Sequence, residues 1–159
     1  MALIVTEVDS AELASELFAA TFKHAVPDFP RHFVALYRDS NTAIKVAGYI
    51  HYSAWEESVW LCGGLCIDPD AYSWTSEAEA ADWKRAGGLG EILLRATFAR
   101  LNDRPAIFGH CGNDKQLQHD LNVGFVPAGP PFLLVKWNRT MSEPDQARLV
   151  TRVAALGQF

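Results

Sequence analysis

The feature that most constrains the fold of this chain is a glycine-rich segment that joins an apolar run to an amphipathic stretch. The apolar run, Val59–Ile67, ends at Asp68-Pro69, and the glycine-rich segment Arg85–Gly90 opens directly into the stretch that begins at Glu91. In that stretch apolar residues recur at the spacing of one helical face. The sequence therefore predicts a strand, a glycine loop and a helix, in that order.

A glycine loop at the start of a helix predicts an anion site. Glycines let the backbone turn sharply, and the first N–H groups of a helix point outward. The helix dipole adds about half a positive charge at that end, and Arg85 adds a full charge. Together these groups favour a phosphate or pyrophosphate ligand. The spacing of the glycines does not match the dinucleotide fingerprint or the phosphate-binding loop of nucleotide triphosphatases.

The loop resembles the Gln/Arg-x-x-Gly-x-Gly/Ala motif of the GNAT superfamily, the acyl-CoA-dependent N-acyltransferases. The three fixed positions of the motif are occupied by Arg85, Gly88 and Gly90. GNAT chains commonly carry a second pattern, Asn-x6-Tyr-x3-Gly-Phe, after the fifth strand. The matching positions here are Asn113, Gly124 and Phe125. The resemblance covers residues 2–138, with the elements in matching order.

This resemblance implies an α/β fold with a mixed, mostly antiparallel central sheet of six or seven strands and helices on both faces. It places an acyltransferase domain at residues 1–139, with an insertion at residues 70–84, because the strand's proline and Arg85 lie farther apart than in the family. A C-terminal helical tail, residues 140–159, follows. The tail helix could pack on its own domain or on a second subunit, so a homodimer is one expectation.

Hydrophobic periodicity and turn signals predict the remaining elements. Strands are expected at residues 2–8, 43–53, 59–67, 105–111, 123–126 and 132–137, and helices at 10–23, 28–38, 76–84, 115–122 and 143–156. The segment 43–53 could be one strand or two that bend at Gly48. The pair Gly63-Gly64 indicates a bulge or a close backbone approach within its strand.

Composition limits the partners and the compartment. A chain of 159 residues suggests one domain, and its net charge of −5 with no basic run argues against nucleic acid. No apolar run is long enough to span a membrane, so no membrane partner is expected. Three cysteines, an odd number, favour a reducing cytoplasm over a disulfide framework. No zinc spacing is present, so no metal is expected.

The resemblance implies acetyl-CoA as cosubstrate and assigns its binding residues. The pyrophosphate would be held by the loop residues Arg85, Ala86, Gly87, Gly88, Leu89 and Gly90. The backbones of Leu65 and Ile67 would bind the pantetheine arm, and Asn113 would contact it near the sulfur. The strand that contains the glycine pair could also offer an N–H to the thioester carbonyl.

The residues for acid and base chemistry are less clearly marked. Family members often protonate the leaving thiolate with a tyrosine at the position of Asp120, and an ordinary aspartate is ionised at pH 7. His119, its neighbour, is therefore the candidate acid, since imidazole titrates near neutrality. The candidate bases are Glu56, Glu57, His51 and His110. A structural role for each histidine is the competing interpretation.

The activity expected from the resemblance is N-acetylation of a primary amine, of a small molecule or a protein, by direct attack on acetyl-CoA. The alternative is a non-catalytic acyl-CoA-binding or protein-interaction module with the same fold. Aromatic residues of the insertion, Tyr72, Trp74 and Trp83, could line a substrate pocket or only fix the insertion to the surface.

Overall fold

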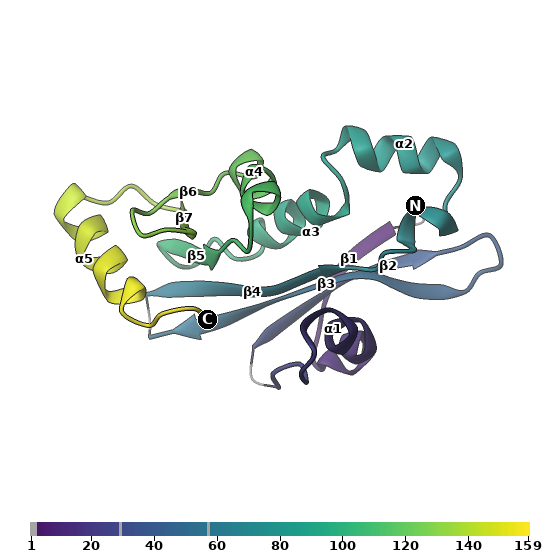
Figure 1. The fold of residues 1–159 in the computed structure, drawn as a ribbon, viewed down its shortest axis with the longest axis horizontal. Coiled ribbons are helices and arrows are strands. Elements are labelled where there is room, and N and C mark those ends of the chain that lie inside the picture. Colours follow the sequence, from purple (N-terminus) through teal and green to yellow (C-terminus); the bar gives the residue numbers. More distant parts are fainter. Residues whose placement is uncertain (1–2, 29, 57) are drawn as a thin grey trace. The chain divides into compact units, whose positions relative to one another are not determined.

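The computed structural model describes residues 3–28, 30–56 and 58–159, which Figure 1 shows as a ribbon. The strands are β1 (Leu3–Val8), β2 (Arg31–Arg38), β3 (Ile44–Trp55), β4 (Val59–Ile67), β5 (Ala106–His110), β6 (Val126–Pro127) and β7 (Leu133–Trp137). The helices are α1 (Ser15–Phe22), α2 (Glu77–Arg85), α3 (Leu89–Phe98), α4 (Asp114–Asn122) and α5 (Glu143–Ala154), with 3-10 turns η1 (Ala11–Ala14) and η2 (Ala71–Trp74).

The described strands form one sheet in the order β1-β2-β3-β4-β5-β7-β6. The pairs β1/β2, β2/β3, β5/β7 and β6/β7 are antiparallel, whereas β4/β5 is parallel. The expected mixed, mostly antiparallel sheet is therefore confirmed. By its contacts the chain divides into a first unit, within Met1–Tyr52 and Gly64–Thr97, and a second unit, Ser53–Gly63 and Phe98–Phe159.

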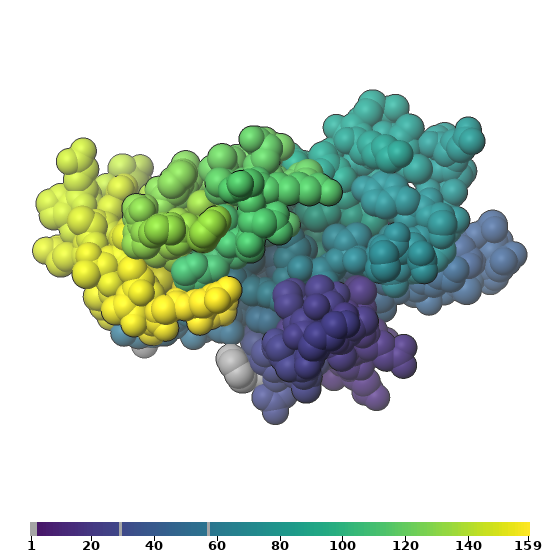
Figure 2. Space-filling view, viewed as in Figure 1, coloured from purple at the N-terminus to yellow at the C-terminus, as the bar shows by residue number. Residues whose placement is uncertain are grey.

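In the first unit, helices cover both faces of the sheet. Successive side chains of β3 point to opposite faces, so this strand contacts a different helix on each face. On one face the ring of Tyr49 lies 5.7 Å from that of Phe18 on α1. On the other face the hydroxyl groups of Tyr52 and Thr97, from α3, are 2.7 Å apart. Figure 2 shows α1 as the dark purple group of side chains on the surface of this unit. Helices on both faces were the expectation.

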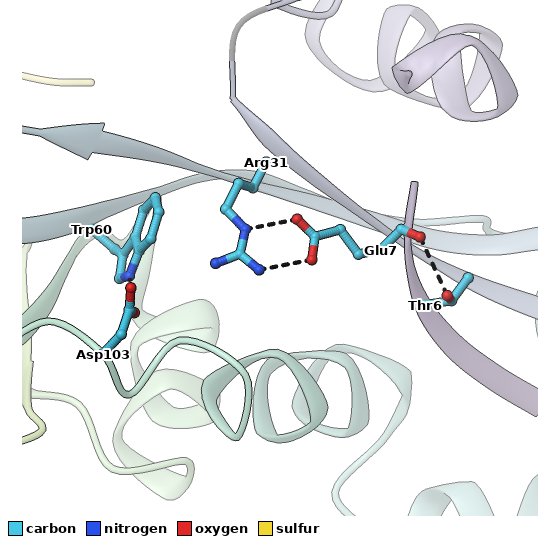
Figure 3. Close-up of polar contacts among 5 residues, drawn as sticks. All are labelled: Thr6, Glu7, Arg31, Trp60 and Asp103. Carbon is cyan, nitrogen blue, oxygen red and sulfur yellow. Dashed lines mark hydrogen bonds and ion pairs between the residues drawn. The ribbon is translucent and has the colours of Figure 1, made fainter. Parts of the chain in front are cut away.

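The helix expected at residues 28–38 was wrong, since Arg31–Arg38 form strand β2. The apolar residues at 33, 34, 36 and 37 suit one helical face as well as a strand. However, β1 and β3 pair with both edges of this segment, and His32, Phe33, Val34 and Ala35 are all buried. Because consecutive residues of a strand point to opposite faces, both faces of β2 are covered and its apolar run is nearly continuous. A bidentate ion pair from Arg31 to Glu7, with both N–O distances 2.7 Å, joins β2 to β1 (Figure 3).

In the second unit, α5 packs on one face of the sheet. Its Leu149 and Val153 join a buried cluster with residues of β4, β5 and β7, namely Val59, Leu61, Ala106, Phe108, Leu133 and Val135. The tail helix therefore packs within its own chain, and the division at residue 139 stays a prediction. The indole N–H of Trp60 on β4 donates to Asp103, before β5, at 2.9 Å (Figure 3).

Two irregularities in the central strands settle the alternatives that the sequence left open. β3 is one continuous strand, although its pairing with β2 shifts register between Ala35 and Leu36, opposite Gly48. On β4, Gly64 has φ +65°, and a Cβ there would lie 2.6 Å from Nδ1 of His51. Glycine at this position is thus required by a close approach to a side chain, together with the left-handed backbone.

Candidate active site

The glycine loop joins α2 to α3 in the first unit, as expected. Helix α2 begins with a capping box, in which Ser76 and Glu79 each bind the other's backbone N–H. Gly87 and Gly88 follow its C-terminal end with φ +94° and +93°, a left-handed conformation that glycine adopts without strain. Next to the loop, Leu65 of β4 lies 4.0 Å from the Cβ position of Gly90.

Most of the loop's own N–H groups are already bonded within the chain. The N–H groups of Ala86, Gly87 and Gly88 donate to carbonyls of α2 at 3.0, 3.1 and 2.8 Å. The N–H of Leu89 donates to the Tyr72 hydroxyl at 3.2 Å. Gly90 is in the first turn of α3, where backbone N–H groups have no carbonyl partner within the helix. In this conformation an anion would meet the α3 terminus and Arg85 rather than a ring of loop amides.

An ion pair between a buried carboxylate and a half-exposed arginine supports the loop. Glu91 is 2% exposed, and its carboxylate lies so close to Gly87 that a Cβ there would overlap it. Arg95 bonds this carboxylate at 2.7 Å and also donates to the carbonyl of Ala86 at 2.7 Å. The pair fixes the loop and neutralises a negative charge near the proposed anion site. This pair was not predicted from the sequence, although its i,i+4 spacing is a helical ion-pair signal.

Arg85 is free to reach a ligand. Its side chain is 74% exposed, and its partner is Asp82 on the same face of α2. An exposed i,i+3 ion pair of this kind contributes little stability. The guanidinium could therefore exchange the carboxylate for a diphosphate at small cost.

The aromatic residues of the insertion have two different roles: some fix the insertion to the rest of the unit, and one lines a cavity. Trp83 is buried and its ring stacks edge-on against Tyr37 of β2 and Tyr72, with centroids 5.4 and 5.5 Å away. Trp83 and Tyr72 therefore fix the insertion and, through the Leu89 bond, the loop. Trp74 instead lines a cavity of about 590 Å³ with Tyr37 and Glu79. Lys45 places its ammonium 4.8 Å from the centre of the Trp74 ring.

Around the left-handed Gly64, the first unit holds a chain of polar side chains. Nδ1 of His32 lies 2.7 Å from the Tyr49 hydroxyl, which lies 3.4 Å from Nδ1 of His51. Burial, with His32 and His24 nearby, lowers the pKa of His51 to about 4. Burial also raises the pKa of Cys66, on β4, to about 11. Tyr49, His51 and Cys66 are therefore uncharged at neutral pH.

In the second unit, Asn113 and His119 belong to α4. Asn113 is the N-cap of this helix, and its side-chain oxygen accepts from the N–H of Gln116 at 2.9 Å. Asp120 is buried, and burial raises its pKa to about 6, against the smaller effects of Gln116 and His119. The pKa of this aspartate is thus higher than that of an ordinary one, although the carboxyl group is still mostly ionised at pH 7. It holds a proton as the pH falls through about 6.

The other candidate bases of this unit have structural partners or lie outside the described residues. His110 shares a hydrogen bond of 3.0 Å between its Nε2 and the carbonyl of Gly157, and its ring stacks on Phe159 at 4.7 Å. Because a carbonyl only accepts, Nε2 carries the proton and only Nδ1 could act as a base. Glu56 forms an ion pair with Arg152. Glu57 lies outside the described residues.

The structure therefore brings Leu65 and the residues 85–90 together in the first unit, with Ile67 on the same strand as Leu65. It places Asn113, His119 and His110 in the second unit. All three cysteines are free thiols. Within residues 3–28, 30–56 and 58–159, no cluster of His, Cys, Asp or Glu could hold a metal ion. No helix in the same ranges is long and apolar enough to cross a membrane.

No protein-family model matches this chain, and no curated protein matches it either. Solved structures do match it. An acetyltransferase of the GNAT family from Staphylococcus aureus is 12% identical over 87% of this chain and 100% of its own, with a TM-score of 0.54. An IAA acetyltransferase from Bacillus cereus is 13% identical, over 78% and 77% of the two chains, with a TM-score of 0.54.

A mutant of the AtaT toxin, bound to the C-terminus of the antitoxin AtaR and to acetyl-CoA, is 16% identical over 95% of this chain and 99% of its own, with a TM-score of 0.54. Identities this low show a shared fold rather than a shared substrate. Together with the sheet order and the loop that precedes α3, they show that the chain has the fold of the GNAT acyl-CoA N-acetyltransferases.

Proposed function

We propose that this chain is an N-acetyltransferase that moves an acetyl group from acetyl-CoA to a primary amine of a small molecule or a protein. The observation that carries the proposal is the loop between α2 and α3, where exposed Arg85 and the N-terminal end of α3 offer positive charge to an anion. The fold supports it, because its solved relatives include acetyltransferases, one with acetyl-CoA bound.

In this proposal the diphosphate of coenzyme A binds at the loop of residues 85–90, through the Arg85 guanidinium and the first turn of α3 that contains Gly90, because the N–H groups of Ala86 to Leu89 are bonded within the chain. The backbones of Leu65 and Ile67 bind the pantetheine arm, and Asn113 contacts it near the sulfur. Asn113 would keep its capping bond, since its amide NH₂ can still donate to a ligand. The three free thiols suit a reducing compartment such as the cytoplasm.

The reaction needs a neutral amine and a proton for the departing sulfur. The amine nitrogen attacks the thioester carbon, the C–N bond forms, and the C–S bond breaks as coenzyme A leaves as a thiolate. The nitrogen loses one proton and the thiolate gains one. Asp120, with its raised pKa, and His119 are the proposed acids.

Acetyl-CoA binding is tested by thermal unfolding with and without the ligand. A ligand at 100 times its Kd adds about 2.7 kcal/mol to the stability of the protein that binds it. Arg85→Ala is expected to weaken binding about tenfold or more, because it removes a charged hydrogen-bond donor. The matched control is Arg148→Ala, which removes another i,i+3 ion pair whose arginine is also 74% exposed. Equal binding by both variants would contradict the role of Arg85.

Release of coenzyme A thiol across a panel of amines tests the enzyme itself. Turnover of any primary amine supports acetyl transfer. If acetyl-CoA stabilises the protein but no amine releases thiol, the alternative of a non-catalytic acyl-CoA-binding module is favoured.

A further inference from the structure

The polar chain of the first unit ends in a histidine whose second nitrogen has no recorded partner among the described residues. His51 shares its Nδ1 with the Tyr49 hydroxyl, and its ring lies against Gly64. The ring and the glycine are both partly exposed, whereas Tyr49 is fully buried. The buried hydroxyl of Tyr49 therefore orients the partly exposed ring of His51 beside Gly64, the residue that precedes Leu65 on β4.

The hydrogen bonds fix which nitrogen of His51 can accept a proton. The hydroxyl of Tyr49 has one hydrogen to donate and two histidine neighbours, at 2.7 Å for His32 and 3.4 Å for His51. If it donates over the shorter distance, it accepts from Nδ1–H of His51. Nε2 of His51 then carries a lone pair. Tyr49 itself stays protonated, because burial raises its pKa.

The rings next to His51 are aromatic. Phe18 lies 5.9 Å from His51 between ring centroids, and Phe22 and His24 lie 4.7 and 5.3 Å from Phe18. The titratable groups that face His51 are His32 of β2, with Asp28 beside it, Tyr49 of β3, Cys66 of β4 and His24 after α1. Aromatic neighbours and an uncharged histidine suit an aromatic ring and disfavour an ammonium ion.

We propose that His51 is the general base of the acetyl transfer and accepts a proton at Nε2 from an aromatic amine as its nitrogen bonds to the acetyl carbon. Tyr49 and His32 are positioning residues. The C–N bond forms, the C–S bond breaks, and the proton on Nε2 passes to solvent. An alkylammonium, with a pKa of about 10.4 in lysine, holds its proton too strongly for this base. An aromatic amine is already neutral at pH 7. The inference rests on the proposed function and narrows its substrate class.

The test compares p-anisidine with benzylamine, two ring-bearing amines that differ in basicity. The wild-type protein is expected to acetylate p-anisidine faster at pH 7. His51→Gln should lower kcat for p-anisidine about 100-fold or more and leave the melting shift with acetyl-CoA unchanged. Free imidazole should restore part of the rate to His51→Ala, which a merely structural role would not allow. Tyr49→Phe should lower kcat less and displace the pH profile of kcat/KM.

Equal p-anisidine rates for wild type and His51→Gln, or faster turnover of benzylamine, would overturn the inference while the acetyl-CoA shift still supports the proposed function. No turnover of either amine in the presence of that shift would also overturn it. No acetyl-CoA shift in the wild-type protein would instead overturn the proposed function, and this inference with it.

Discussion

Gly87→Ala tests how the loop before α3 is held, because this glycine is required for two separate reasons. Its φ of +94° costs an L-residue about 1–2 kcal/mol. A Cβ would also overlap the Glu91 carboxylate, which must then move away from Arg95. Weakening the bond of this buried carboxylate costs about 1–3 kcal/mol. The expected total is about 2–5 kcal/mol of unfolding free energy.

Gly129→Ala is the matched control, since Gly129 has a similar φ of +109° and nothing within 4 Å of its Cβ position. It should cost only the backbone strain, about 1–2 kcal/mol. Urea unfolding followed by tryptophan fluorescence measures both variants, and Trp83 reports on the first unit. Equal losses for the two variants would refute the argument that Glu91 occupies the space at Gly87.

Two further predictions concern buried polar groups. Burial raises the pKa of Asp120 from 3.8 to about 6, so the folded protein binds this proton more tightly than the unfolded chain does. The contribution of Asp120 to stability should therefore fall by about 1–3 kcal/mol as the pH rises from 4 to 6. Asp120→Asn should remove this dependence in unfolding experiments across that range, and an unchanged profile would contradict it. Tyr52→Phe or Thr97→Val should each cost about 0.5–1.5 kcal/mol by removing the hydrogen bond between two buried hydroxyl groups. The double variant should cost less than the sum of the two, and strict additivity would show that the hydroxyl groups do not interact.

The segments with a local signal were predicted well from the sequence. Glycines mark the start of α3, a capping box marks α2, and a serine followed by acidic residues marks α5. The order of these elements, with the motif residues Arg85, Gly88 and Gly90, was enough to indicate the fold. Such signals depend on residues close together in the chain, so periodicity and spacing carry them.

Long-range contacts decided what the sequence could not. The segment Arg31–Arg38 was predicted to be a helix, but it is a strand whose consecutive residues are buried, so both of its faces are covered. The loop amides were expected to be open to a ligand, but α2 and the Tyr72 hydroxyl bind most of them. An ordinary pKa was expected for Asp120, but burial raises that pKa to about 6.

Local spacing therefore determined the elements and the family resemblance of this protein. Burial and hydrogen bonding are set by residues far apart in the sequence, as in the group formed by His32, Tyr49, His51 and Gly64. Only the tertiary structure could decide which polar groups are charged, bonded or available to a ligand, because those properties depend on the groups that surround each side chain.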